Sequence, residues 1–165
     1  MKTTQFKEKY GQYALVAGGS DGLGFAFAEA IARRGLNLVL IARQEDRLKA
    51  AAARLKEIYE IDVISIAADM ADYENVKKLI STLKVSIGLL VYNAAFAPIG
   101  LFENTSEDHL ALATAVNVKA PLLLTKLLSA SMIQQKRGGI VLMSSLAGAQ
   151  AVTSTILGKL FRLLP

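Results

Sequence analysis

Five short apolar runs alternate along the chain with segments whose apolar residues recur every three or four positions. The apolar runs span residues 13–17, 37–42, 62–67, 88–92 and 140–143, and the periodic segments span residues 23–34, 48–59, 72–83 and 105–135. Runs that are apolar on both faces predict buried strands, and periodic segments of this length predict helices. Buried strands separated by helices predict a parallel sheet covered on both sides, so we expect a doubly wound α/β fold of about five strands.

Capping residues mark the start of two of these helices. Asp72 precedes a helix that presents Val76 and Ile80, so it is the predicted N-cap of that helix. The stretch Thr105-Ser-Glu-Asp108 resembles a capping box in which Asp108 replaces the usual glutamate.

The composition excludes several kinds of site. The 165 residues include no cysteine and a single histidine, His109, which excludes disulfides, thiolate metal sites and a histidine-rich metal centre. No apolar run approaches the roughly 18 residues of a membrane span, and the N-terminus lacks the apolar segment of a secretory signal. We therefore expect a cytoplasmic protein with no metal site and no stable membrane span.

The charges are unevenly distributed. The formal net charge is +5 at pH 7, and the charged residues after Asp108 are all basic. They are spread out and have no interleaved aromatic residues, so nucleic acid is not an expected partner. The absence of acidic residues there also follows if this region is mostly core helix and core strand.

A glycine-rich turn follows the first predicted strand. It reads Ala17-Gly-Gly-Ser-Asp-Gly-Leu-Gly24 and leads directly into a helix. Glycines allow a tight turn and let the backbone approach a pyrophosphate, which is stabilised by the helix N-terminus. This position between the first strand and the first helix predicts a dinucleotide-binding loop, and a turn without ligand is the alternative.

The end of the second strand indicates which dinucleotide is bound. An acidic residue there would accept the ribose hydroxyls of NAD, but this chain has Ala42 followed by Arg43. A guanidinium suits a 2′-phosphate through charge-assisted hydrogen bonds, and Ser20 would add a hydroxyl. We therefore expect NADP(H) in preference to NAD(H), unless Arg43 is simply an exposed residue at a strand end.

The glycine spacing and the order of the elements resemble the short-chain dehydrogenase/reductase family. The phrases "KYGQYALVAGGSDGLG" and "ARRGLNLVLIAR" are similar to the branch that contains hydroxysteroid dehydrogenases and long-chain 3-ketoacyl reductases, although Ala17 replaces the usual threonine. The resemblance implies a Rossmann domain over residues 1–151, with 152–165 as an atypical tail. It also implies an NADP(H)-dependent oxidoreductase that acts on a small-molecule carbonyl or alcohol.

The resemblance implies further cofactor contacts. Asp69 would bind the adenine amino group, although a helix-capping role is the alternative. Tyr92-Asn-Ala-Ala95 is similar to the family's Asn-Asn-Ala-Gly, so Asn93 would hold the central sheet and line the cofactor site. The full set of cofactor-binding residues predicted in this way is Gly18, Ser20, Asp21, Gly22, Leu23, Gly24, Arg43, Asp69, Met70, Asn93, Ala94 and Ala95.

Asn117 and Ser145 match the family's catalytic asparagine and serine. The asparagine would support a water relay, and the serine would hold the substrate oxygen. Pro121 has no N–H, so the α-helical bond to the Asn117 carbonyl cannot form and that carbonyl is expected to be free for water. The alternatives are a kinked helix with a buried polar residue and ordinary capping serines.

The family's catalytic tyrosine and lysine have no counterparts at the expected positions. By the family's spacing these positions are Gly158 and Arg162, and residues 152–165 contain no tyrosine. Lys159 is out of register, and arginine does not readily lose a proton at neutral pH. We therefore expect this chain to be catalytically inactive.

The family's next long helix and last two strands are also absent from the 165 residues. Their absence predicts exposed apolar surface beside residues 140–143 and on the helix around 122–124, and hence self-association.

Three hypotheses remain open at this point. The first is an oxidoreductase, as the resemblance implies, although the missing tyrosine and lysine oppose turnover. The second is a truncated or frameshifted product that retains at most nucleotide binding. The third is a non-catalytic dinucleotide-binding module that pairs with a full-length relative. A methyltransferase is more remote, because it would need acidic residues where Ala17 and Arg43 stand.

Overall fold

The computed structural model describes residues 3–98 and 100–145. Its centre is one parallel sheet of five strands in the order β3-β2-β1-β4-β5. The strands are β1 (Tyr13–Ala17), β2 (Asn37–Ala42), β3 (Val63–Ala67), β4 (Ile87–Tyr92) and β5 (Gly139–Leu142). The predicted doubly wound fold is confirmed, and each predicted strand lies within one residue of its observed bounds. The strand order reverses between β1 and β4, which is where open α/β sheets bind ligands.

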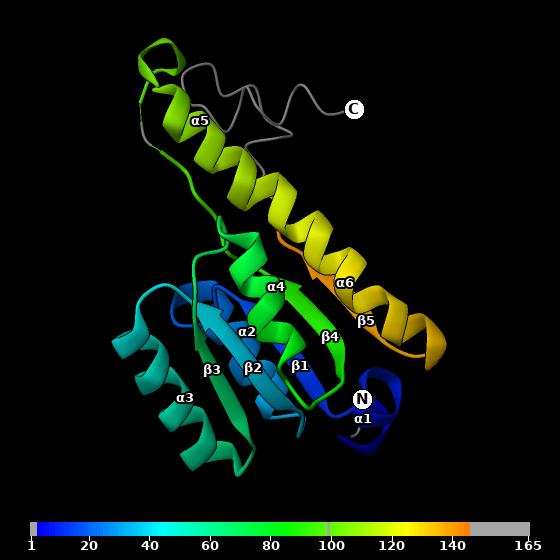
Figure 1. Ribbon diagram of the computed structural model, residues 1–165. Coiled ribbons are helices and arrows are strands. Elements are labelled where there is room, and N and C mark those ends of the chain that lie inside the picture. Colours follow the sequence, from blue (N-terminus) through cyan, green and yellow to red (C-terminus); the bar gives the residue numbers. More distant parts are fainter. Residues whose placement is uncertain (1–2, 99, 146–165) are drawn as a thin grey trace.

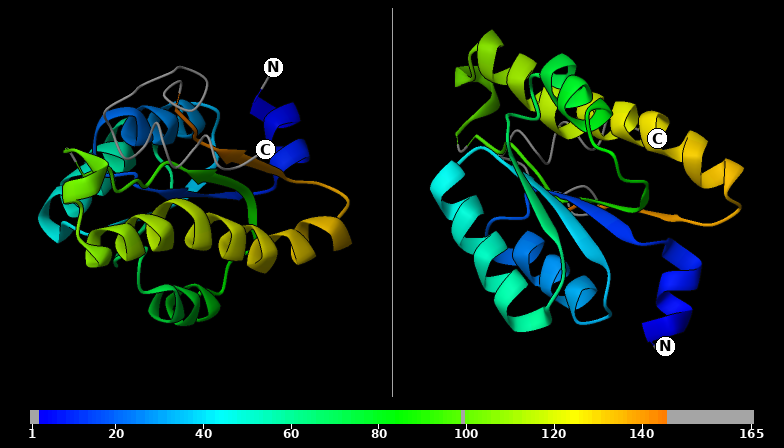
Figure 2. Two further views of the ribbon diagram at one scale, coloured as in Figure 1. Left: turned by 90° about the horizontal axis from the view of Figure 1, so that it is seen from above. Right: turned by 60° about the horizontal axis from the view of Figure 1, so that its bottom comes forward.

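Helices cover both faces of the sheet (Figure 1, Figure 2). The helices α2 (Gly22–Ala32) and α3 (Glu45–Tyr59) lie on one face, and α4 (Tyr73–Ser81) and α6 (Ala120–Gln134) lie on the other. The N-terminal helix α1 (Thr3–Tyr10) packs Phe6 and Tyr10 against the α2 and α3 side of the core. Each central strand therefore has both of its faces buried.

Alternate residues of β1 enter the two halves of the core. Ala14 and Val16 belong to the apolar cluster beneath α2 and α3, whereas Leu15 and Ala17 belong to the cluster beneath α4 and α6. All four side chains are completely buried. Because successive strand residues point to opposite faces, a strand covered on both sides must be apolar throughout.

The two predicted helix starts have different outcomes. Asp72 is the N-cap of α4, as predicted, and its carboxylate accepts a hydrogen bond of 3.1 Å from the backbone N–H of Asn75. The predicted capping box is wrong. Ser106 is the N-cap of α5 (Glu107–Thr114) and accepts from the N–H of His109, while the Thr105 hydroxyl donates to the Leu101 carbonyl. The preceding 3₁₀ turn η1 (Phe102–Asn104) engages Thr105, so the helix starts one residue later.

The helix α5, the π turn η2 (Ala115–Lys119) and α6 form one continuous helix, Glu107–Gln134. By length and composition alone this helix is able to cross a membrane. One stripe of it packs on the sheet and contains the buried residues Val116, Ala120, Leu124, Leu128 and Met132.

Apolar side chains on the opposite side of this helix and on β5 are exposed. Leu122 is 60% exposed, and each of the four residues from Ile140 to Met143 is more than one third exposed. The expected exposed surface is therefore present at these positions, but Leu124 is wrongly included in it, because Leu124 is fully buried.

Candidate functional site

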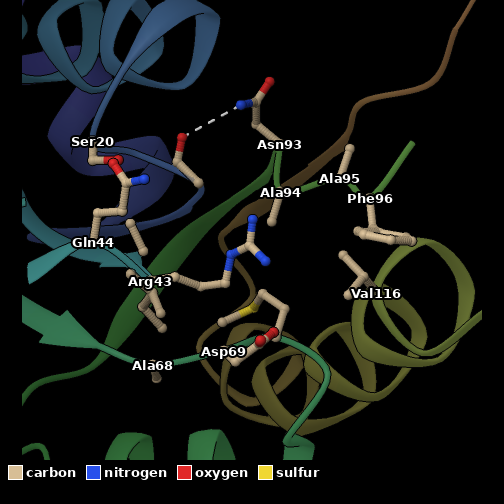
Figure 3. A pocket seen from close by; sticks show the side chains of 14 residues that line it. Ser20, Arg43, Gln44, Ala68, Asp69, Asn93, Ala94, Ala95, Phe96 and Val116 are labelled. Carbon is tan, nitrogen blue, oxygen red and sulfur yellow. Dashed lines mark hydrogen bonds between the residues drawn. The ribbon is translucent and has the colours of Figure 1, made fainter. Parts of the chain in front are cut away.

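The segments that follow β1, β2, β3 and β4 enclose a cavity of about 230 Å³ at the carboxyl edge of the sheet (Figure 3). The cavity lies at the point where the strand order reverses. Most of the predicted cofactor-binding residues line it together, namely Gly18, Ser20, Arg43, Asp69, Met70, Asn93, Ala94 and Ala95.

Two glycines allow the turn after β1 to pack closely against the end of β4. Gly18 has a φ of +78°, and a Cβ there would lie 2.8 Å from the backbone nitrogen of Ala94. A Cβ on Gly24 would lie 1.9 Å from the Gly18 carbonyl oxygen. Gly22 has a φ of +54° and open space around it, so its requirement is conformational. The absence of a Cβ at Gly18 and Gly24 therefore lets the turn pack on the end of β4 and the start of α2 pack on the end of β1.

Asp21, Gly22, Leu23 and Gly24 do not line this cavity. The Asp21 carboxylate caps α2 by accepting from the Gly22 N–H at 2.7 Å, and its second oxygen lies 3.6 Å from a guanidinium nitrogen of Arg47. Gly24 is buried under the turn, and Leu23 lines a second cavity. These four residues are therefore close to Gly18 in the sequence but do not line the same cavity.

Asn93 links the end of β4 to the glycine turn. Its backbone N–H donates to the Ala17 carbonyl at 2.9 Å, and its side-chain amide donates to the Gly18 carbonyl at 3.4 Å (Figure 3). These bonds hold β1 and β4 together at the reversal of strand order.

Arg43 and Asp69 bring opposite charges to the cavity. Arg43 follows the last residue of β2, and its guanidinium extends toward the middle of the cavity in Figure 3. Among the described residues Arg43 forms no ion pair. Asp69 follows β3, and one of its carboxylate oxygens accepts from the Ala71 N–H at 2.9 Å. Asp69 thus stabilises its own turn and lines the cavity at the same time.

A second cavity of about 560 Å³ adjoins the first along Asn93, Ala94 and Ala95. It brings together Asn117 and Ser145, the two residues matched to the family's catalytic positions. Much of its wall is apolar and comes from Leu23, Val118, Pro121, Leu122, Leu142 and Met143. The sequence did not reveal this cavity, because its wall combines residues of α2, the long helix and the end of β5.

The side-chain amide of Asn117 is bonded to the backbone of Phe96. Its oxygen accepts from the Phe96 N–H at 2.9 Å, and its nitrogen donates to the Phe96 carbonyl at 2.7 Å. The two bonds attach the segment after β4 to the long helix. They also explain why Phe96, which sequence reasoning missed, lines the first cavity.

Tyr92, at the end of β4, supplies the next contact with the long helix. Its side chain is only 3% exposed, and its hydroxyl donates a short hydrogen bond of 2.5 Å to the Val116 carbonyl. Burial, and to a smaller extent the Asp69 carboxylate, raise the pKa of Tyr92 well above its ordinary value. Tyr92 therefore stays protonated at neutral pH.

The π turn changes the expected effect of Pro121. In the turn, the Ala120 N–H donates to the Ala115 carbonyl, five residues back. In this register the Val116 carbonyl would need the N–H of Pro121, which proline lacks. In the α-helical register of α6, Pro121 also has no N–H for the Asn117 carbonyl, so that expectation stays a prediction. The π turn adds Val116 as a second carbonyl that Pro121 does not serve. Tyr92 supplies the donor that Val116 would otherwise lack.

Sequence reasoning missed one further residue of the first cavity, Gln44. Its position directly after Arg43 at a strand end was a usable signal.

The positions Gly158 and Arg162, where the family's tyrosine and lysine were expected, lie outside the residues that the structure describes. Within residues 3–98 and 100–145, no three histidine, aspartate or glutamate side chains gather as a metal site would require.

Comparisons with known proteins agree with this geometry. A sequence model of the family described as short chain dehydrogenase matches residues 12–157. The chain is 36% identical over 142 residues to Inactive hydroxysteroid dehydrogenase-like protein 1 of Homo sapiens, covering 84% of this chain and 43% of that protein. It is 37% identical over 148 residues to the Very-long-chain 3-oxoacyl-CoA reductase of Phaeosphaeria nodorum, covering 84% and 42%. The chain thus spans less than half the length of these curated relatives.

Among solved structures, the fold is similar to the short-chain dehydrogenase from Sphingobium yanoikuyae in complex with NADPH. The TM-score is 0.83 at 29% sequence identity, and the match covers 92% of this chain and 60% of that one.

Proposed function

Because the chain belongs to the short-chain dehydrogenase family, a family of oxidoreductases, we propose that it binds NADP(H) in the cavity between β1, β2, β3 and β4. We further propose that the 165 residues hold the dinucleotide without catalysing carbonyl reduction or alcohol oxidation. The observation that carries the proposal is that Gly18 and Ser20 of the glycine turn and Arg43 line one cavity.

The residues present fit a dinucleotide. Gly18 lines the cavity without a side chain, so the backbone of the turn would lie close to a pyrophosphate bound there. Asp69 would accept from the adenine amino group, with the oxygen that the Ala71 N–H does not use. Asn93 would keep the turn in place through its bond to the Gly18 carbonyl.

The preference for NADP(H) rests on the residues that follow β2. Ala42, Arg43 and Gln44 line the cavity there, and none of them is acidic. The Arg43 guanidinium would form bidentate, charge-assisted hydrogen bonds with a 2′-phosphate, and the Ser20 hydroxyl would add another. The NADPH complex of the Sphingobium yanoikuyae relative supports this choice.

The second cavity would receive the carbonyl or alcohol substrate. When bound, the nicotinamide supplies or accepts a hydride, and the Ser145 hydroxyl would orient the substrate oxygen. Asn117 would support this arrangement by holding the segment after β4 through Phe96.

Among the described residues that line this cavity, no tyrosine is available for the proton transfer of the reaction. Tyr92 is the only tyrosine among the described residues that line it, and its hydroxyl is already bonded to the Val116 carbonyl. All five tyrosines of the chain precede Ser145. The word "inactive" in the name of the human relative supports the same conclusion.

A pair of measurements on the purified chain tests the proposal. Titrations followed by NADPH and NADH fluorescence should show saturable binding that is tighter for NADPH. Incubation with NADPH and a panel of ketones should give no ketone-dependent loss of absorbance at the NADPH maximum. Ketone-dependent oxidation of NADPH would contradict the inactivity, equal or tighter binding of NADH would contradict the preference, and the absence of binding to either would refute the site.

A further inference from the structure

We propose that Tyr92 and Pro121 together lock the π turn of the long helix, and that Tyr92 is thereby a positioning residue for the dinucleotide cavity. The inference rests on the proposed function only in its choice of ligand, NADP(H). The lock itself is a property of the contacts between β4 and the π turn, Ala115–Lys119.

The first part of the lock is the unpaired carbonyl. In the π turn the Ala120 N–H donates to the Ala115 carbonyl, and the same spacing of five residues would pair the Val116 carbonyl with position 121. Pro121 has no N–H and cannot close the ladder there. Val116 is buried, and a buried carbonyl without a donor is costly, so this backbone needs a partner from another element.

The second part is the donor. The Tyr92 hydroxyl comes from β4, reaches the Val116 carbonyl and has almost no exposure to water. The next residue of the turn, Asn117, is held from the same side of the fold by Phe96, which follows β4. Two consecutive residues of the turn are thus tied to one strand end.

These ties form the partition between the two cavities. Val116 and Phe96 line the first cavity, whereas Tyr92, Asn117 and Pro121 line the second. An α-helix turns by about 100° per residue, so removing the extra residue of the π turn would rotate Val116 and Asn117 relative to α6. The Tyr92 hydroxyl therefore decides which side chains face each cavity.

A double-mutant cycle tests the lock through a bond that only this geometry can restore. Tyr92→Phe removes the donor, and Pro121→Ala supplies an N–H five residues after Val116, at the spacing of the π turn. The matched control is Tyr73→Phe, because the Tyr73 hydroxyl donates to the Leu123 carbonyl of the same helix, outside the π turn. The readouts are NADPH affinity and the side-chain amide resonances of Asn117 in ¹H–¹⁵N spectra.

We expect Tyr92→Phe to weaken NADPH binding by about five- to tenfold and to shift the Asn117 amide resonances, because one buried carbonyl loses its donor. Tyr73→Phe should stay within about twofold of the parent chain, and the double variant Tyr92→Phe/Pro121→Ala should return to within about twofold. If Tyr92→Phe unfolds the chain, recovery of the folded spectrum in the double variant supports the lock.

Unchanged Asn117 resonances in Tyr92→Phe, or a loss that Pro121→Ala does not repair, would overturn the lock. Absence of NADPH binding by the parent chain would count against the proposed function alone, since the Asn117 resonances still report on the lock.

Discussion

The carbonyl oxygen of Gly18 lies 1.9 Å from the place that a Cβ on Gly24 would occupy. The same oxygen accepts a hydrogen bond from the Asn93 side chain. The first turn of α2 is therefore packed directly on the backbone that ends β1, and this contact holds Gly18, which lines the first cavity, in place.

Gly24→Ala should destabilise the chain far more than Gly22→Ala. The Cβ at position 24 meets backbone that cannot move without displacing β1, so a loss of more than about 4 kcal/mol is expected. At position 22 the Cβ has open space, and only the left-handed backbone opposes it, at roughly 1–2 kcal/mol. Urea unfolding of the two variants measures the difference, and equal losses would show that the close contact is not rigid.

Arg43→Gln should weaken the binding of ligands that carry a 2′-phosphate and leave others unchanged. Loss of the charge-assisted bonds predicts roughly a tenfold or greater decrease in affinity for 2′,5′-ADP, with little change for 5′-AMP. Calorimetric titration of both nucleotides gives the comparison. Lys56→Gln is the control, because it removes the same charge from an exposed position on α3. A similar decrease for both nucleotides, or with the control, would contradict the assignment of Arg43.

Asn117→Ala should lower the free energy of unfolding by about 1–3 kcal/mol, because both backbone groups of Phe96 lose their partner. Asn117→Asp keeps the acceptor for the Phe96 N–H but places a carboxylate against the Phe96 carbonyl, so it should not restore stability. Denaturant unfolding with Asn104→Ala as an exposed control separates this contact from a general effect. A loss below about 0.5 kcal/mol would show that the contact contributes little.

The stability of the chain should decrease as the pH rises above about 10, and Tyr92 should account for much of the decrease. Because burial raises the pKa of Tyr92 in the folded chain, the unfolded chain loses this proton first. The stabilisation is present below the ordinary tyrosine pKa and is lost above it, by up to about 1.4 kcal/mol per pH unit.

Urea unfolding between pH 9 and about 11.5 measures this slope. Tyr92→Phe should remove most of this slope. Tyr73→Phe should remove less of it, because Tyr73 is only partly buried, although burial raises its pKa as well. An unchanged slope in Tyr92→Phe would contradict the burial of this hydroxyl.

The sequence by itself determined the strands, the glycine turn and the residues that follow each strand. These features are local, since a strand covered on both faces must be apolar throughout, as Leu15 and Val16 are. The parallel arrangement then brings the strand ends to one edge, so Gly18, Arg43, Asp69 and Asn93 were predicted to meet and do line one cavity.

Only the tertiary structure decided the register of the long helix and the contacts that depend on it. An α-helical pattern of apolar residues does not reveal a π turn, so the sequence linked Pro121 to the Asn117 carbonyl and missed its effect on the Val116 carbonyl. The hydrogen-bond partners of the π turn are distant in the sequence. Tyr92 lies 24 residues before Val116, and Phe96 lies 21 residues before Asn117. Which buried carbonyl finds a donor is determined by how β4 packs on the helix, and that packing exists only once the sheet has formed.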